Sequence, residues 1–352
     1  MGCDRSIGGM REEILLSVLV KAYNEEARIA KCLAAIFAAV DLANTEVILV
    51  DSLSEDRTVE TARRFPVEIV QFAYTRDRGC GAAAQLGYQF ARGRYLLLLD
   101  GDMILDPGFL PAAMMRLEAA PRLAGIGGVI RELSTTLEYQ QRQLRKDPSH
   151  GIGAVSHLDG GGLFRMQALR SVGYLADRNL HSFEEFELGL RLRQQGWGLE
   201  RIDVPYVDHL GHQRPPYALL LMRWRSRYLR GYGELLRVSW GTPRMLAAVR
   251  KAQIFLAVLL WWAGLLAATT CAVMGSNAAA LGLAGLFALP LLLLIVRKRS
   301  APTALYTLAL WNLYAAALVT GLLARATDPR APITGVILTG EKSSISGLQS
   351  IK

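Results

Sequence analysis

The sequence predicts an α/β protein: a doubly wound, mostly parallel sheet followed by a helical transmembrane region. Short apolar runs alternate with helical segments in the first half, and long uncharged stretches fill the second half. Of the 352 residues, 51% are hydrophobic and 20% are charged. This balance excludes a disordered chain, a collagen-like repeat and a small disulfide scaffold.

Four short apolar runs mark the strands of the predicted sheet. They are Ile14–Val20, Glu46–Val50, Val67–Phe72 and Tyr95–Leu99. The segments between them carry helical spacing, over Ala27–Val40, Arg57–Arg64 and Gly81–Ala91. Strands and helices that alternate at this pace predict parallel strands with helices on both faces of the sheet.

Polar or acidic clusters follow three of these four runs. They are Tyr23–Glu26 after the first, Asp51-Ser52 after the second, and Asp100-Gly101-Asp102 after the fourth. Ligands of parallel sheets bind beyond the carboxyl ends of the strands, so these acids are expected at one edge. Two carboxylates around a glycine suit Mg²⁺ or Mn²⁺, which in turn bridges diphosphate oxygens. A single acid here is equally typical of a helix cap, whereas several at neighbouring ends favour a ligand site.

Two uncharged stretches follow, from Ala252 to Val296 and from Ala301 to Ala324. A membrane span needs ~20 apolar residues, so we expect three spans. They are placed at about 254–274, 278–296 and 303–324. A buried helical hairpin of a soluble protein is the alternative, and uncharged runs of this length disfavour it.

Basic residues at the span ends indicate the orientation. Arg250 and Lys251 precede the first span, and residues 297–299 separate the second from the third. If all three segments cross, both clusters lie on one side, which the positive-inside rule assigns to the cytoplasm. The tail after Ala324 then lies outside, unless the third segment re-enters without crossing.

The segment 213–251 holds most of the net charge of +9, with nine basic residues and a single acid, Glu234. Aromatic residues such as Trp224 and Trp240 are interleaved with the arginines, and the segment leads into the first span. This pattern indicates an interface with anionic membrane lipids. A nucleic-acid groove is the weaker interpretation, and we expect no nucleic-acid partner.

Four blocks follow one another along the chain: Val18–Glu26, Val50–Asp56, Gly79–Gly87 with Asp100-Gly-Asp102, and Gly160–Arg165 with Glu184–Arg191. Together they make the region from about Ile14 to His212 resemble a family-two glycosyltransferase with the GT-A fold, a Rossmann-like sheet. The fourth block resembles an acceptor-side loop and the acidic helix that bears the catalytic base.

The resemblance implies a role for each of these positions. The implied donor-binding residues are Tyr23, Glu25, Asp51, Gly79, Gly81 and Asp100. The implied ligands of Mg²⁺ or Mn²⁺ are Asp100, Asp102 and His209. The residues that the resemblance implies for the acceptor or diphosphate side are Gly161, Gly162 and Arg227. The implied catalytic residues are Glu185, as the base, and Glu184, with Glu187 as a further reserve.

Several positions depart from the family pattern. Lys21 stands where a proline is usual, Cys80 and Gln85 replace a commoner lysine and asparagine, and Glu185 replaces an aspartate. Ser182 three residues before Glu185 also fits a capping box, which needs no chemistry. The arginine-rich stretch around Arg227 lacks the glutamine of the Gln-x-x-Arg-Trp signature, so a non-processive enzyme is expected.

These observations divide the chain into four parts. They are a catalytic domain (1–212), a basic aromatic interfacial segment (213–251), transmembrane helices (252–325) and a C-terminal tail (326–352). We expect a bacterial inner-membrane protein with a cytoplasmic catalytic domain. It would move a sugar, with inversion, from a nucleotide-diphosphate donor to a lipid-linked or saccharide acceptor, in cell-surface polysaccharide or glycolipid synthesis.

Three other functions are alternatives to this one. Transfer to a polyprenyl phosphate needs no base, because that acceptor is already anionic. A non-catalytic nucleotide-binding membrane protein is less favoured, since the spans carry few polar residues to line a transport path. Dinucleotide oxidoreduction is disfavoured because no Gly-x-Gly-x-x-Gly follows the first strand.

Overall fold

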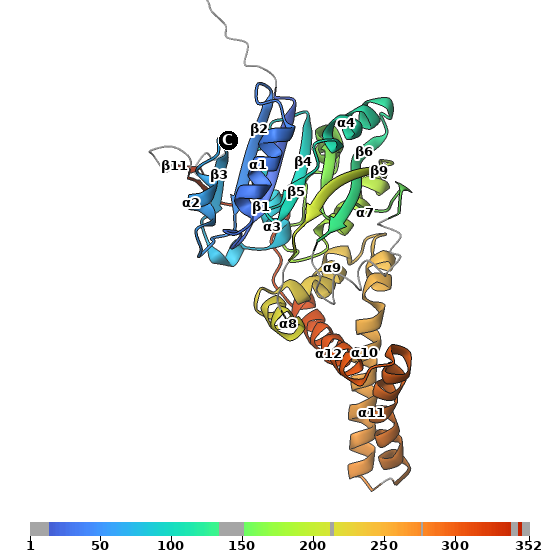
Figure 1. Cartoon of the computed structure of the whole chain (residues 1–352). Helices are drawn as coiled ribbons and strands as arrows, with labels where there is room; N and C mark the ends of the chain where they lie inside the picture. The colour runs from blue at the N-terminus through green and yellow to red at the C-terminus, as the bar shows by residue number, and fades with distance from the viewer. Residues whose placement is uncertain (1–13, 134–150, 212–214, 276, 339–343, 347–352) are drawn as a thin grey trace, which may run out of the picture.

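A computed structural model of the chain describes residues 14–133, 151–211, 215–275, 277–338 and 344–346. An α/β domain sits above a set of long helices (Figure 1). One mixed sheet runs through the domain in the order β11-β10-β3-β2-β1-β4-β8-β6-β9-β5, and β7 pairs with β9.

The first four strands form the parallel part of the sheet, as the apolar runs predicted. They are β1 (Leu16–Ala22), β2 (Thr45–Asp51), β3 (Glu68–Phe72) and β4 (Tyr95–Asp100). β1 lies between β2 and β4, and all three pairings in the order β3-β2-β1-β4 are parallel. The predicted doubly wound arrangement is confirmed here.

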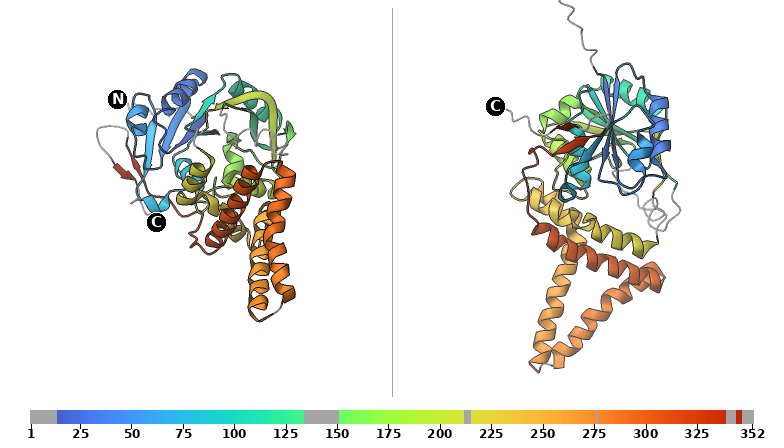
Figure 2. Two further views of the ribbon diagram at one scale, coloured as in Figure 1. Left: turned by 60° about the horizontal axis from the view of Figure 1, so that its bottom comes forward. Right: turned by 90° about the vertical axis from the view of Figure 1, so that its left-hand side faces the viewer.

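Helices cover both faces of this sheet, which the right view of Figure 2 shows edge-on. One face carries α1 (Ile29–Ala39), α2 (Thr58–Ala62) and α4 (Phe109–Ala119); the other carries α3 (Cys80–Tyr88), α6 (Met166–Ser171) and α7 (Glu184–Gln194). In β1, the side chains of Val18 and Val20 pack in the core on the face that carries α1, α2 and α4. The side chain of Leu19 packs in the core on the opposite face. This alternation explains why the run is apolar throughout.

The second half of the sheet is mixed. Its strands are β5 (Met103–Leu105), β6 (Leu123–Glu132), β7 (Gly153–Ala154), β8 (Gly162–Arg165) and β9 (Gly198–His209). β8 is antiparallel to both β4 and β6, whereas β6 and β9 are parallel. A short 3₁₀ helix, η1 (Thr75–Asp77), precedes α3.

The membrane-proximal elements follow β9. They are α8 (Pro216–Arg225), η3 (Tyr228–Arg230), α9 (Gly231–Ser239), α10 (Met245–Val273), α11 (Asn277–Lys298) and α12 (Ala301–Leu322). α10 and α11 form a hairpin that points away from the domain, while α12 lies between them and the domain (Figure 2). Within the described ranges, α10 and α12 are long and apolar enough to cross a membrane.

The C-terminal strap, defined as residues 325–338, returns to the α/β domain. Its strand β10 (Gly335–Ile337) pairs antiparallel with β3, and β11 (Ser344–Ser346) adds beyond it. The expectation that the tail lies across the membrane from the domain is therefore wrong. The physical reason is that β3 would otherwise leave an open sheet edge, and backbone hydrogen bonds from the strap cover it.

Candidate active site

The predicted acids lie at one edge of the sheet because the strands are in register. Ala22 at the end of β1 is paired with Asp51 of β2, and Lys21 is paired with Asp100 of β4. The carboxyl ends of three neighbouring strands therefore meet, as parallel strands require.

The loops that follow β1 and β2 are joined by hydrogen bonds. The amide of Asn24 donates to Ser54 Oγ at 2.9 Å, and the amide of Glu55 donates to Asn24 Oδ1 at 2.8 Å. Asn24 and Leu53 both have positive φ angles, of 55° and 59°. A left-handed conformation is costly for a branched residue such as Leu53, and such strain is concentrated at functional sites.

Asp51 is fully buried between these loops. Its Oδ2 accepts hydrogen bonds from the amide of Ser54 (3.0 Å) and from Gln71 Nε2 (2.8 Å). Its Oδ1 is buried and has no hydrogen-bond partner among the described residues. Nearby, the exposed ring of Tyr23 lies 4.9 Å from the guanidinium of Arg78. Asp51 thus keeps one acceptor atom available for an N–H group.

Lys21 connects the two sides of the site. Its Nζ lies 3.0 Å from Asp100 Oδ1 and 3.3 Å from Glu184 Oε1. Burial lowers the pKa of Lys21, but the attraction of Asp100 and Glu184 outweighs it and raises that pKa well above its usual value. The sequence marks Lys21 only as a departure from the family pattern. A lysine near the end of an apolar strand, in register with an aspartate, is the signal that could have identified this pair.

Asp102 is held from the opposite side by His209. The Nε2 of His209 lies 3.2 Å from Asp102 Oδ2, and its Nδ1 lies 2.6 Å from Glu132 Oε2. Burial lowers the pKa of His209, but the hydrogen bonds to these two acids raise it to about 10. A cationic imidazole here neutralises Asp102, and it would bind a metal ion only after exchanging one of these contacts. Glu132, absent from the predicted site, belongs to this cluster.

The carboxylates of Asp100 and Asp102 fit a divalent ion whose remaining ligands are phosphate oxygens and water. No set of three His, Cys, Asp or Glu side chains within the described ranges forms a complete metal site. Mg²⁺ usually takes one or two carboxylates and completes its shell with phosphates and water. The side chain of Asp100 is 41% exposed, so it can be reached by an ion from solvent. Burial and repulsion from Asp102 also raise the pKa of Glu25 to about 7, which reflects crowded negative charge.

Glu185 faces the acceptor-side loop. Its Oε2 accepts a hydrogen bond of 3.0 Å from the amide of Gly160. Burial, assisted by repulsion from Glu184 and opposed by Lys21, raises the pKa of Glu185 to about 8. A capping box is not formed, because the hydroxyl of Ser182 donates to the carbonyl of Tyr228 instead. A carboxylate with this pKa is suited to general base catalysis near neutral pH.

Most of the predicted glycines serve close packing. A Cβ on Gly81 would lie 2.2 Å from the carbonyl oxygen of Asp177, and the amide of Gly81 donates to Leu180 O. Gly161 and Gly162 have positive φ angles and press against β4 and β6. Gly79 is less crowded: a Cβ there would make ordinary contacts of 3.5 Å with His181 Cδ2 and the carbonyl oxygen of Leu180, and Gly79 precedes the first residue of α3. These contacts bring the loops to the site.

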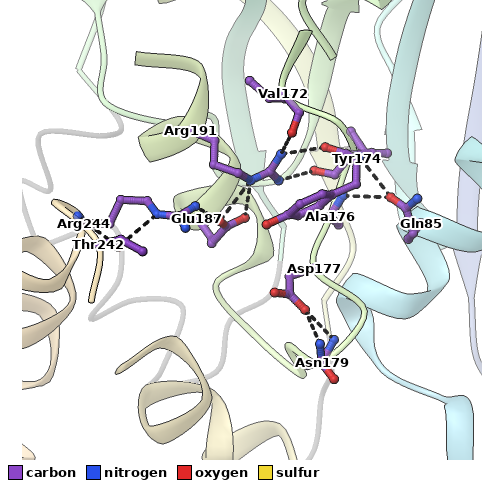
Figure 3. Close-up of polar contacts among 11 residues, drawn as sticks. Gln85, Val172, Tyr174, Ala176, Asp177, Asn179, Glu187, Arg191, Thr242 and Arg244 are labelled. Carbon is purple, nitrogen blue, oxygen red and sulfur yellow. Dashed lines mark hydrogen bonds and ion pairs between the residues drawn. The ribbon is translucent and has the colours of Figure 1, made fainter. Parts of the chain in front are cut away.

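Glu187 anchors helix α7, which also carries Glu184 and Glu185 (Figure 3). Its carboxylate binds Arg191 Nε at 2.8 Å and Arg244 Nη1 at 2.6 Å, and it is 1% exposed. Arg191 also lies 3.7 Å from the ring centre of Tyr174 and donates to that residue's carbonyl. Glu187 is therefore fully used as an ion-pair partner, which disfavours it as a reserve base.

Gln85, which departs from the asparagine common in the family, has a structural role. Its side-chain oxygen accepts hydrogen bonds from the backbone amides of Leu175 and Ala176.

A second contact ties the loop before α7 to the membrane-proximal segment. Glu234, the single acid of that segment, accepts hydrogen bonds from the amide of His181 at 2.9 Å and pairs with its Nδ1 at 2.8 Å. Arg227 is exposed and has a φ of 65°, directly before η3. The structure thus explains why one acid lies among nine basic residues.

Comparison with known proteins agrees with this geometry. A family model described as glycosyl transferase family 2 matches residues 17–173. The dolichol-phosphate mannosyltransferase of Pyrococcus furiosus is 29% identical over 100 residues, which cover 27% of this chain and 28% of that protein. The dodecaprenyl-phosphate galacturonate synthase of Rhizobium johnstonii is 33% identical over 115 residues, covering 30% and 33%. The matches span about a third of these relatives.

Among solved structures, a mannosyltransferase from Pyrobaculum calidifontis in complex with GDP-Man and Mn²⁺ has a similar fold. Its TM-score is 0.55 at 20% identity, and the match covers 88% of this chain and 86% of that one. The predicted resemblance is confirmed: residues 17–173 match the family-two glycosyltransferase model, and the fold is similar to that of a solved GT-A glycosyltransferase.

Proposed function

We propose that this chain is a membrane-bound, inverting glycosyltransferase that moves a sugar from a nucleoside diphosphate to an acceptor at the membrane surface. The observation that carries the proposal is the position of Lys21, which links Asp100 of the donor side to Glu184 of the acidic helix. An enzyme of this kind needs its donor and acceptor groups within a few ångströms of each other, because proximity supplies much of the rate.

The donor binds across the ends of β1, β2 and β4. Asp51 receives an N–H group of the nucleobase at Oδ1, and Tyr23 and Glu25 line the nucleoside site. Gly79 and Gly81 shape the start of α3 beside the diphosphate. The buried, unpaired oxygen of Asp51 supports this role, since an unsatisfied acceptor costs free energy until a donor arrives.

Asp100 and Asp102 would hold Mg²⁺ or Mn²⁺, with His209 and Glu132 keeping Asp102 in place. When bound, the ion neutralises charge on the departing diphosphate. Lys21 adds a fixed positive charge beside Asp100 from the protein itself.

Glu185 acts as the base. It takes the proton of an acceptor hydroxyl, whose oxygen then forms a bond to the anomeric carbon while the bond to the diphosphate breaks on the opposite face. The raised pKa of Glu185, about 8, supports this role, because a base works best when its pKa is near the working pH. Glu184 stays paired with Lys21 and orients the helix.

The acceptor is a lipid-linked or saccharide molecule that approaches past Gly161, Gly162 and Arg227. Arg227 is exposed at the junction of the domain and the membrane-proximal helices. A second candidate is direct transfer to a polyprenyl phosphate, which the names of two relatives favour. In that reaction the acceptor oxygen is already anionic and Glu185 is dispensable.

The enzyme would lie in a bacterial inner membrane with its catalytic domain in the cytoplasm, serving cell-surface polysaccharide or glycolipid synthesis. Basic residues at 250–251 and 297–299 flank the hairpin on the side of the domain, which is the arrangement of cytoplasmic ends. Membrane lipids are therefore constant partners.

The proposal is tested with purified protein, a panel of radiolabelled nucleotide sugars, Mg²⁺ or Mn²⁺, and a lipid extract. We expect label to pass into the lipid or saccharide fraction from one donor. Nucleotide-sugar binding with neither transfer nor hydrolysis would overturn the proposal in favour of a non-catalytic regulator.

Glu185→Gln distinguishes the two acceptor classes. If the acceptor is a hydroxyl, the transfer rate should fall by about 10²–10⁴-fold, which is the usual contribution of a general base. Glu60→Gln, on the exposed face of α2, is the matched control and should leave the rate unchanged. A near-normal rate for Glu185→Gln would favour the phosphate acceptor.

A further inference from the structure

We propose that this protein meets the membrane in two layers: the α10–α11 hairpin enters the bilayer, and α8 and α12 lie along its interface beneath the catalytic domain. The partner is a lipid bilayer with anionic headgroups. This arrangement replaces the three spans expected from hydropathy and does not depend on which sugar is transferred.

Both ends of α12 contact elements on the side of the catalytic domain. Near its start, the ring of Tyr306 lies 5.1 Å from Tyr217 of α8. Near its end, the carbonyl of Gly321 accepts a hydrogen bond of 3.2 Å from Arg237 of α9. These two residues of α12 are separated by about 22 Å along the helix axis, at 1.5 Å per residue. A helix that crossed the membrane would carry one of these contacts to the far side.

The packing of α12 against α9 is close. A Cβ on Gly233 would lie 1.9 Å from the carbonyl oxygen of Leu318, and one on Gly321 would lie 2.3 Å from that of Arg230. Backbones approach this closely only where glycine leaves room. The position of α12 beneath the domain is therefore fixed by specific contacts.

The C-terminal strap gives independent support. Asn179, in the loop before α7, exchanges two hydrogen bonds with Thr327, of 2.7 and 2.8 Å. Arg178 donates to the carbonyl of Ala331 at 3.1 Å, and β10 pairs with β3. The chain thus leaves the domain before α10 and returns to it after α12. The number of times that the chain completely crosses the membrane between these two points must therefore be even.

The hairpin fits the bilayer core. Its uncharged run begins at Ala252, and the 22 residues to Val273 span about 33 Å as a helix, against a hydrocarbon thickness of about 30 Å. Large apolar side chains of α10 face outward along this length, including Leu260, Leu266 and Val273. No other described element covers them.

The interface layer has the chemistry of a headgroup region. α8 exposes Tyr217, Leu221 and Trp224, while Arg225 on the same helix supplies exposed positive charge. Trp240, after α9, is 74% exposed. Aromatic and basic side chains together are typical of helices that lie in the membrane interface and bind anionic lipid.

Single cysteines labelled with a membrane-impermeant maleimide test the number of crossings. The full chain is reconstituted in sealed phosphatidylethanolamine–phosphatidylglycerol vesicles, after all four native cysteines (Cys3, Cys32, Cys80 and Cys271) are replaced by alanine. Met115→Cys reports the domain, Met274→Cys the hairpin tip and Ala326→Cys the strap; all three positions are exposed. We expect Ala326→Cys and Met115→Cys to label from one face, and Met274→Cys from the other.

Two labelling results would overturn the proposal. Labelling of Ala326→Cys together with Met274→Cys would establish three crossings. Labelling of Met274→Cys together with Met115→Cys would show that the hairpin does not cross.

A depth measurement tests the position of α12 directly. A fluorophore on Leu305→Cys of α12 should be quenched most by lipids that carry a nitroxide near the headgroup. The same fluorophore on Leu266→Cys of α10 should be quenched most by a nitroxide near the chain end. Both leucines are exposed, which makes them matched positions. Equal deep quenching at Leu305 would place α12 in the hydrocarbon core and overturn its assignment to the interface.

Discussion

The proposed donor side and the proposed acceptor side of the site are assembled in different ways. On the donor side, the loops after β1 and β2 bind each other through backbone amides and short polar side chains, as between Asn24 and Ser54. On the acceptor side, α7 is held by residues of the membrane-proximal segment, through Glu187 with Arg244 and His181 with Glu234. The donor side therefore depends on the sheet, whereas the acceptor side depends on helices that adjoin the membrane.

The largest effect should follow from breaking the acceptor-side anchor. Glu187→Ala leaves Arg191 buried without its carboxylate, which should lower the free energy of unfolding by about 3–5 kcal/mol. Thermal unfolding in detergent measures this loss. Nucleotide binding, measured where the variant is still folded, should be unchanged. A parallel loss of nucleotide affinity would contradict the division into two sides.

Lys21→Met tests the link between the two sides. It leaves Asp100 and Glu184 close together without a cation. We expect a loss of about 1–3 kcal/mol in unfolding free energy, less than for a fully buried pair because Asp100 is partly exposed. The rate of sugar transfer should also fall. Thermal unfolding in detergent measures the loss of stability. If stability and transfer both match the wild type, Lys21 does not connect the sites.

The pH dependence of transfer should sharpen the assignment of Glu185. Because the pKa of Glu185 is about 8 and the base is the ionised form, the rate should rise with pH and level off above about 8. Below that value the rate should fall about tenfold per pH unit, or about 1.4 kcal/mol. Rates with saturating donor from pH 6 to 9 measure the curve. A rate that is flat over this range would remove Glu185 as the base.

The smallest effect is expected at the exposed rim of the donor loops. Arg57 is largely exposed and pairs with Glu26 at 2.6 Å. Arg57→Ala should leave the free energy of unfolding nearly unchanged, since exposed ion pairs contribute little. Thermal unfolding of this variant and of the wild type under the same conditions tests this expectation. A larger loss would mean that the two donor loops depend on this pair.

Much of the catalytic domain could be predicted from local pattern. The four parallel strands follow the apolar runs, and the alignment of Asp51 with the end of β1 follows from parallel register. The resemblance also predicts Glu185 as a site residue, but it gives the partner Gly160 only as part of a motif. Lys21 was recognised as unusual without a role, because its two partners are 79 and 163 residues away in the chain.

The sequence by itself determined the alternation of strands and helices, the acids at the strand ends and the uncharged hairpin, since each depends on neighbouring residues and their periodicity. Only the tertiary structure decided that α12 runs beneath the domain and that the C-terminal strap joins β3. Hydropathy measures how apolar a helix is, but not what its two ends contact. Those contacts, made between residues far apart in the chain, decide on which side of a membrane each segment lies.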